Sequence, residues 1–137
     1  MMGSGISGGF GNTRGGSSNT LDGSDTLPNH QNAQIDPNKI VNYALNPSHP
    51  VGGNKAKVFE SALGFNQSNA NQFMAQIQQQ LPNSRAILGV NDKYGQRFTV
   101  DMSITGPNGK TVIVRTGWII ETGSTIPRLT TTYVQGR

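Results

Sequence analysis

The amino-acid sequence predicts an α+β domain in which N-terminal helices are followed by a four-stranded antiparallel meander. Up to residue 81, apolar residues recur every three or four positions, which is the helical period. From residue 86 onward they alternate with polar residues, as in a strand with one buried face. Short turn segments separate the predicted strands, and short connections join antiparallel neighbours. This order places the helices as one layer on one face of the sheet.

Three helices are expected. The first begins at Asp36-Pro37, because aspartate is a good N-cap and proline suits the first helical position, and it ends before Pro47. The second covers residues 54–63, with Gly64 as its C-terminal cap. The third covers residues 70–81 and has glutamines on its solvent face. Its apolar stripe consists of Ala70, Phe73, Met74, Ile77 and Leu81.

Four strands follow, separated by turns at residues 91–95, 106–109 and 121–124. The first is the short apolar segment 86–90, and the sole tryptophan, Trp118, is expected to be buried under the helices. The apolar alternation of the other strands is carried by Phe98, Val100, Met102 and Ile104, then Val112, Val114, Thr116, Trp118 and Ile120, then Leu129, Thr131 and Tyr133.

The alternation also predicts which residues lie on the face of the sheet away from the helices. If Leu129 points inward, Arg128, Thr130 and Thr132 point outward, and Arg115 shares their face. Arginine binds phosphate with two parallel N–H donors, so this face is a candidate phosphate-binding surface. A solvated sheet face explains the same residues equally well, since threonine is common in strands.

Composition divides the chain of 137 residues into a tail and one domain. Residues 1–26 hold eight of the eighteen glycines and five serines, so we expect a flexible linker there and the folded domain in residues 27–137. That domain carries ten Lys or Arg against five Asp or Glu, which favours an anionic partner such as RNA. No secretory signal and no membrane-spanning segment are expected.

The segment 49–57, with the sequence HPVGGNKAK, contains the best candidates for catalysis. It sets one of only two histidines beside the densest group of lysines, at the start of a helix. Such groups can bind and cleave a phosphodiester. In a metal-independent ribonuclease His49 would be the acid/base and Lys55 would stabilise the developing charge. A helix-start signal with a solvated histidine is the alternative interpretation.

Further candidates lie outside that segment. Arg115 could clamp the phosphate, with Thr130 or Thr132 donating a hydrogen bond to it. The candidate substrate-binding residues are Arg128, Tyr94 and Lys57, and the tyrosine could stack on a base. Whether the other histidine, His30, belongs to the site is left open. The chain has no cysteine and few carboxylates, so neither a metal site nor a cofactor is expected.

Several motifs in a fixed order resemble an uncharacterised bacterial domain family that occurs alone or at the C-terminus of polymorphic toxins. The motifs are LPN at 27–29, HPVG at 49–52 with KA at 55–56, LGF at 63–65, GPNGK at 106–110, RT at 115–116 with WII at 118–120, and PRL at 127–129. The first 26 residues are similar in texture to filamentous-haemagglutinin-like exoproteins, including those of contact-dependent growth inhibition.

The resemblance implies a toxin effector domain delivered from a producing cell, by secretion or from its surface, into the cytoplasm of a target cell. Many such domains are ribonucleases of barnase- or colicin-type layout, so the implied substrate is RNA, tRNA foremost. It also implies a cognate immunity protein, which should be acidic because this domain is basic.

Two other functions remain open from the sequence. One is a non-catalytic module that binds a protein or a nucleic acid. The other is a DNase, although most DNases hold a divalent metal with carboxylates or histidines, and the acidic residues here are scattered. No Gly-x-Ser-x-Gly or Walker-type motif points to a protease or a nucleotide-dependent transferase.

Overall fold

The computed structural model of the protein describes residues 25–136, so the expected linker lies outside the described residues except for its last two. Those two belong to the packed domain. Thr26 is buried, and the carbonyl oxygen of Asp25 accepts a 2.8 Å hydrogen bond from the N–H of Ala86. Packing therefore begins at least two residues before the expected boundary. Within the described part, no helix is long and apolar enough to cross a membrane.

The helical half consists of α1 (Pro37–Lys39), η2 (Ile40–Ala44), α2 (Gly53–Leu63) and α3 (Ala70–Gln80). Three single turns accompany them: η1 (His30–Asn32) before α1, η3 (Gln67–Asn69) between α2 and α3, and η4 (Leu81–Asn83) after α3. The Asp36 carboxylate accepts the N–H of Asn38 at 2.9 Å, as an N-cap should. The single first helix that we expected is instead one α-turn that continues as the π-helix η2. Such π segments are frequent at functional sites.

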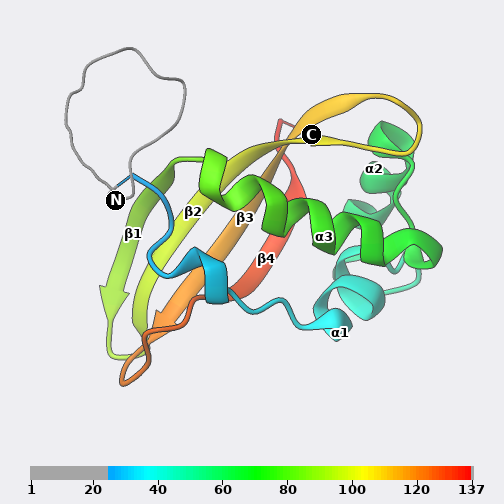
Figure 1. Ribbon diagram of the computed structural model, residues 1–137. Helices are drawn as coiled ribbons and strands as arrows, with labels where there is room; N and C mark the ends of the chain where they lie inside the picture. Colours follow the sequence, from blue (N-terminus) through cyan, green and yellow to red (C-terminus); the bar gives the residue numbers. More distant parts are fainter. Residues whose placement is uncertain (1–24, 137) are drawn as a thin grey trace, which may run out of the picture.

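The sheet half consists of β1 (Ala86–Asp92), β2 (Gly95–Thr105), β3 (Thr111–Glu121) and β4 (Arg128–Val134). The strands lie in the order β1-β2-β3-β4 and all neighbours are antiparallel. The predicted α+β meander is therefore confirmed. Figure 1 shows the helices gathered on one face of the sheet, with α3 lying across it.

The core lies between the helices and the inner face of the sheet. Trp118 is 1% exposed and belongs to the same apolar cluster as Phe73 and Ile77, which confirms its predicted burial. Its indole N–H donates to the Thr116 hydroxyl at 2.8 Å, and that hydroxyl donates to the carbonyl of Val100 at 2.7 Å. Both buried polar groups are thus satisfied inside the core.

Two of the sequence motifs meet at the end of α2. The turn between β2 and β3 contains Asn108, whose backbone N–H and side-chain amide donate to the carbonyls of Leu63 and Ala62, both at 3.2 Å. Gly64 follows with a φ of 84°, the left-handed conformation that favours glycine at a helix C-terminus. The LGF and GPNGK motifs therefore have a structural role, because they satisfy the last carbonyls of α2.

A β-bulge overturns one of the predictions for β4. Gly117 pairs with Thr131, but Trp118 pairs with Leu129, which leaves Thr130 as an extra residue in β4. Beyond the bulge the alternation is inverted. Thr132 lies opposite buried Thr116 and is itself buried, so the prediction that Thr132 faces outward is wrong. For the same reason Thr131 and Tyr133 lie on the outer face, against the alternation that we expected for them.

Candidate functional site

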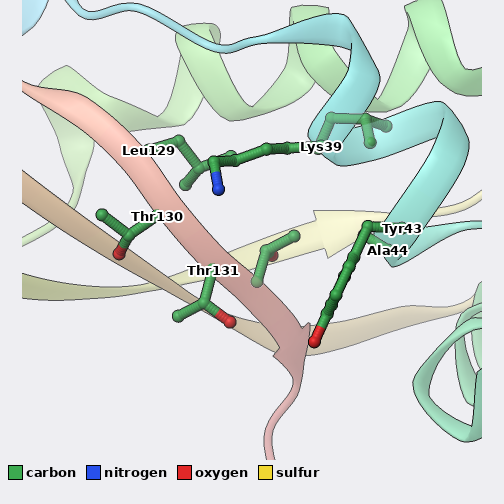
Figure 2. A pocket seen from close by; sticks show the side chains of 8 residues that line it. Lys39, Tyr43, Ala44, Leu129, Thr130 and Thr131 are labelled. Atoms are coloured by element: carbon green, nitrogen blue, oxygen red, sulfur yellow. The ribbon is translucent and has the colours of Figure 1, made fainter. Parts of the chain in front are cut away.

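A cavity of about 320 Å³ lies where the helical layer meets the edge strand β4. One wall is the helical turn from Lys39 to Ala44 and the other is the bulged part of β4 (Figure 2). Residues 33–35 cover the start of β4, because Gln34 exchanges backbone hydrogen bonds with Pro127 and Leu129. The cavity opens just beyond this covered stretch. Its lining residues are Lys39, Ile40, Tyr43, Ala44, Leu129, Thr130, Thr131 and Thr132.

Two polar groups of this cavity bear on its chemistry, the ammonium of Lys39 and the hydroxyl of Thr132. Lys39 forms no ion pair within residues 25–136, and its side chain extends from the helix toward β4 (Figure 2). The hydroxyl of Thr132 is buried and makes no hydrogen bond within the described part of the chain. A buried hydroxyl is normally paired, so the unpaired Thr132 hydroxyl is an unusual feature of the cavity wall.

His49 contacts Tyr43, one of the residues that line the cavity. The two ring centroids are 4.3 Å apart and the planes are tilted by 53°. The Nδ1 atom of His49 accepts the N–H groups of Val51 and Gly52, both at 3.0 Å. In this arrangement Nδ1 carries no proton, so the ring proton is on Nε2 and only Nε2 is free to contact a substrate.

The glycines of the HPVGG segment are explained by close packing around this loop. A Cβ atom on Gly52 would lie 3.0 Å from the ring of Tyr43, and one on Gly53 would lie 2.6 Å from the carbonyl oxygen of Pro47. The segment is therefore a tightly folded loop that leads into α2, and His49 holds this loop by accepting the two N–H groups that precede the helix. The segment therefore fits the helix-start interpretation, and the same residue, His49, is also the one to which the functional interpretation assigns chemistry.

Lys55 and Arg115 belong to one chain of contacts on the outer side of β4. The ammonium of Lys55 lies 4.9 Å from the centre of the Tyr133 ring. Arg115, opposite Tyr133 in the register, donates to Asp101 at 2.8 and 3.0 Å. The hydrogen bond to Asp101 and, to a smaller extent, the one to Tyr133 raise the pKa of Arg115 above its ordinary value. This guanidinium therefore stays charged. It is, however, already paired with a carboxylate.

The residues that the sequence predicted for the site separate into those that the structure brings to the cavity or to β4 beside it and those that it does not. The first group has five members. Thr130 and Thr132 line the cavity, His49 contacts its Tyr43 wall, and Lys55 and Arg115 both contact Tyr133 on β4.

The other candidates are not brought to this cavity by any observed contact. Arg128 pairs with Glu121 at 3.1 Å, at the beginning of β4. Tyr94 lies in the β1–β2 turn, 60% exposed, with the ammonium of Lys93 5.2 Å from its ring centre. Lys57 is exposed on α2, and His30 lies in η1.

Sequence reasoning missed Lys39, Tyr43 and Thr131 in the cavity and Tyr133 beside it. One signal was available for the helical pair. Lys39 and Tyr43 are four residues apart in the first predicted helix, a spacing that places two side chains on one face. Nothing in the sequence links that face to β4. Among residues 25–136, no group of three or more His, Cys, Asp or Glu side chains is arranged to hold a metal ion.

These features define an α+β domain with one helical layer on an antiparallel meander and a small cavity of mixed polar and apolar lining at an edge strand. The chain belongs to the family described as a domain of unknown function (DUF6883), which matches residues 26–136. The chain is thus a member of an uncharacterised domain family, as the resemblance predicted, whereas the motifs and the toxin context stay predictions. No curated protein matches the chain.

The fold is also similar to a chain in a solved structure, the "Contact-dependent growth inhibition toxin - immunity protein complex from Klebsiella pneumoniae 342". The TM-score is 0.53 and 18% of residues are identical. The match covers 74% of this chain and 98% of that one. At this level of identity the match establishes a shared fold.

Proposed function

We propose that this domain is the effector of a bacterial contact-dependent inhibition or related polymorphic toxin, and that it cleaves RNA without a metal ion. tRNA is the proposed substrate and the cytoplasm of a target cell the proposed site of action, after delivery from the producing cell by secretion or from its surface. The fold shared with a chain of a toxin–immunity complex supports the toxin class. Of the two proteins in such a complex, the toxin is the better match for a chain with a net charge of +4, because a toxin that cleaves RNA must bind a polyanion.

The observation that carries the proposal is that His49 packs on Tyr43 of one cavity wall, while Lys55 contacts Tyr133 of β4, the strand that forms the other wall. RNA cleavage by the 2′-hydroxyl needs donors and cations that stabilise the charge developing on the phosphate. His49 would donate a hydrogen bond to a phosphate oxygen through Nε2. Lys55, which Tyr133 holds by a cation–π contact, would supply positive charge. Arg115 would position Tyr133, because its own donors are engaged by Asp101.

A cleavage assay tests the proposal. The purified domain is incubated with total tRNA in EDTA and the products are separated on a gel. We expect discrete fragments with the wild type, and a loss of about a hundredfold in rate for Lys55→Met. Lys110→Met removes the same charge from the exposed β2–β3 turn and should cleave at the wild-type rate. Intact tRNA with the wild type would contradict the ribonuclease.

A second candidate function has its own supporting observation. Arg115 and Arg128 are both ion-paired, and Nδ1 of His49 is occupied by the loop that it caps. Such an arrangement also suits a module that binds RNA or a protein without cleaving it. The same gel separates the two functions, because intact tRNA of lowered mobility would indicate a binder.

The toxin class predicts a partner as well. A producing cell must neutralise the domain with an immunity protein, and an acidic partner complements this basic chain. We expect that expression of the domain alone stops bacterial growth. Harmless, high-level expression of the folded domain would contradict the toxin class.

A further inference from the structure

We propose that the cavity at the β4 edge binds a single nucleotide unit, with its phosphate near Lys39 and Thr132 and its base against the apolar wall. The unit could be a free nucleotide or one residue of an RNA chain, and the two share this chemistry. The inference deepens the proposed function where RNA is the source, and it assigns Lys39, Tyr43 and Thr132 to substrate binding.

The size of the cavity limits the ligand. Small-molecule sites in proteins span roughly 300–1,000 Å³, and the volume of about 320 Å³ lies at the lower end of that range. A lone phosphate ion would leave much of this space empty. One nucleotide is a better match than two.

The polar groups of the cavity favour an anion. Lys39 is a half-buried cation without an ion-pair partner in the described part of the chain. Thr132 is 5% exposed, and its hydroxyl oxygen is buried without a hydrogen bond. A hydroxyl left in this state destabilises the free protein, and the penalty would be removed if the Thr132 side chain turned toward the cavity and its hydroxyl donated to a phosphate oxygen. Lys39 would offset the phosphate charge at the same time.

The rest of the lining suits a base. Ile40, Ala44 and Leu129 are buried apolar residues, and the ring of Tyr43 lies along one side of the cavity (Figure 2). Aromatic side chains stack on unpaired bases in single-stranded RNA. His49 packs on the Tyr43 ring, which places the cavity next to the residue proposed to contact the phosphodiester.

Calorimetric titration with simple probes tests the assignment. The probes are an equimolar mixture of the four nucleoside 3′-monophosphates, the four nucleosides, and inorganic phosphate. We expect measurable binding of the nucleotides and at least tenfold weaker binding of nucleosides and of phosphate. Lys39→Met and Thr132→Val should each weaken nucleotide binding at least tenfold. Lys110→Met and Thr99→Val are matched controls on other parts of the surface and should bind as the wild type does.

Thermal unfolding supplies a second readout that a purely structural role would not produce. Thr132→Val removes an unpaired buried hydroxyl, so it should raise the melting temperature of the free protein by a few degrees while it weakens binding. Nucleotide should raise the melting temperature of the wild type and leave that of Thr132→Val almost unchanged. A destabilised Thr132→Val variant that binds nucleotide normally would overturn the assignment.

The remaining outcomes also decide the matter. Equal affinity for phosphate and nucleotides would reduce the cavity to a simple anion site and overturn the nucleotide assignment, as would nucleotide binding unchanged in Lys39→Met. Nucleotide binding at this cavity without tRNA cleavage would leave the inference standing and contradict the ribonuclease. If the protein cleaves tRNA but its cavity binds no nucleotide, the ribonuclease stands and the nucleotide assignment is overturned. Tight binding of an RNA oligonucleotide but weak binding of mononucleotides would identify RNA as the source.

Discussion

The two edge strands of the sheet, β1 and β4, differ in a way that their sequences conceal. β1 is the more apolar at first sight, yet Ile87, Leu88 and Val90 are 56%, 70% and 61% exposed. β4 is rich in threonine, yet Leu129 and Thr132 are 1% and 5% exposed.

The difference comes from where the helices lie. α3 packs against β2, whereas α2 and η2 contact β4. In Figure 1, β1 lies at the edge of the sheet beyond these helices. Burial in an edge strand is therefore decided by the covering layer and not by the strand's own hydrophobicity. The cavity and its neighbouring charged groups occur at the covered edge, because α2 and η2 pack against this edge strand.

The difference in burial between β4 and β1 should have its largest effect on stability when one leucine in each strand is replaced. Leu129→Ala in β4 empties a fully packed position and should destabilise the domain by about 2–5 kcal/mol. Leu88→Ala in β1 removes an exposed side chain and should change stability by about 0.5 kcal/mol or less. Urea unfolding of the two variants gives both values. Equal losses would mean that β1 is covered in solution.

Two glycines test the backbone of the same strands. At Gly117, beside the bulge, a Cβ atom would lie 2.8 Å from the Thr131 methyl group. Gly117→Ala should therefore destabilise by about 1–3 kcal/mol through overpacking. At Gly89 in β1 the nearest atom is the carbonyl oxygen of Arg97 at 3.2 Å, so Gly89→Ala should cost less, about 1 kcal/mol at most. A neutral Gly117→Ala in a melting experiment would contradict a fixed approach of the Thr131 methyl group to Gly117.

Substitutions of His49 have a small expected effect on stability and give the clearest separation of roles. His49→Ala leaves the N–H groups of Val51 and Gly52 without an acceptor and should cost about 1 kcal/mol. His49→Asn keeps an acceptor two and three residues before those N–H groups, so it should preserve stability. Both variants lose Nε2 and should lose tRNA cleavage.

The contrast between these variants decides what His49 does. Thermal melts and the tRNA assay are run side by side, with Lys110→Met as a control for handling. If His49→Asn cleaves tRNA as fast as the wild type, His49 is only the cap of the loop.

The regular part of the fold could be predicted from the sequence because it depends on local patterns. The apolar stripe of α3, the cap at Gly64 and the Gly-Pro-Asn-Gly turn each depend on neighbouring residues, and all of them are observed. The bulge could not be placed this way, because it is a mismatch between two strands and leaves the β4 sequence itself unremarkable. The one local signal of the bulge is Gly117 in β3, because a glycine inside an apolar strand often marks a close approach of another backbone.

The candidate site could be predicted only in fragments for the same reason. His49 and Lys55 share a motif, so their neighbourhood is visible in the sequence. The partners that give them context, Tyr43 and Tyr133, come from a preceding helix and from the last strand. The pairing of Arg115 with Asp101 depends on strand register, which places the two residues directly opposite each other. Tertiary structure supplies each of these contacts.

The central claim is that substrate contacts the β4 edge, and chemical-shift mapping with an RNA that cannot be cleaved tests it most directly. A 2′-O-methylated oligonucleotide retains phosphates and bases but lacks the attacking hydroxyl. We predict that its addition shifts the backbone resonances of Lys39, Tyr43 and residues 130–132, and leaves those of β1 unchanged. Shifts confined to residues 87–94, at the exposed β1 edge and its turn, would contradict the claim.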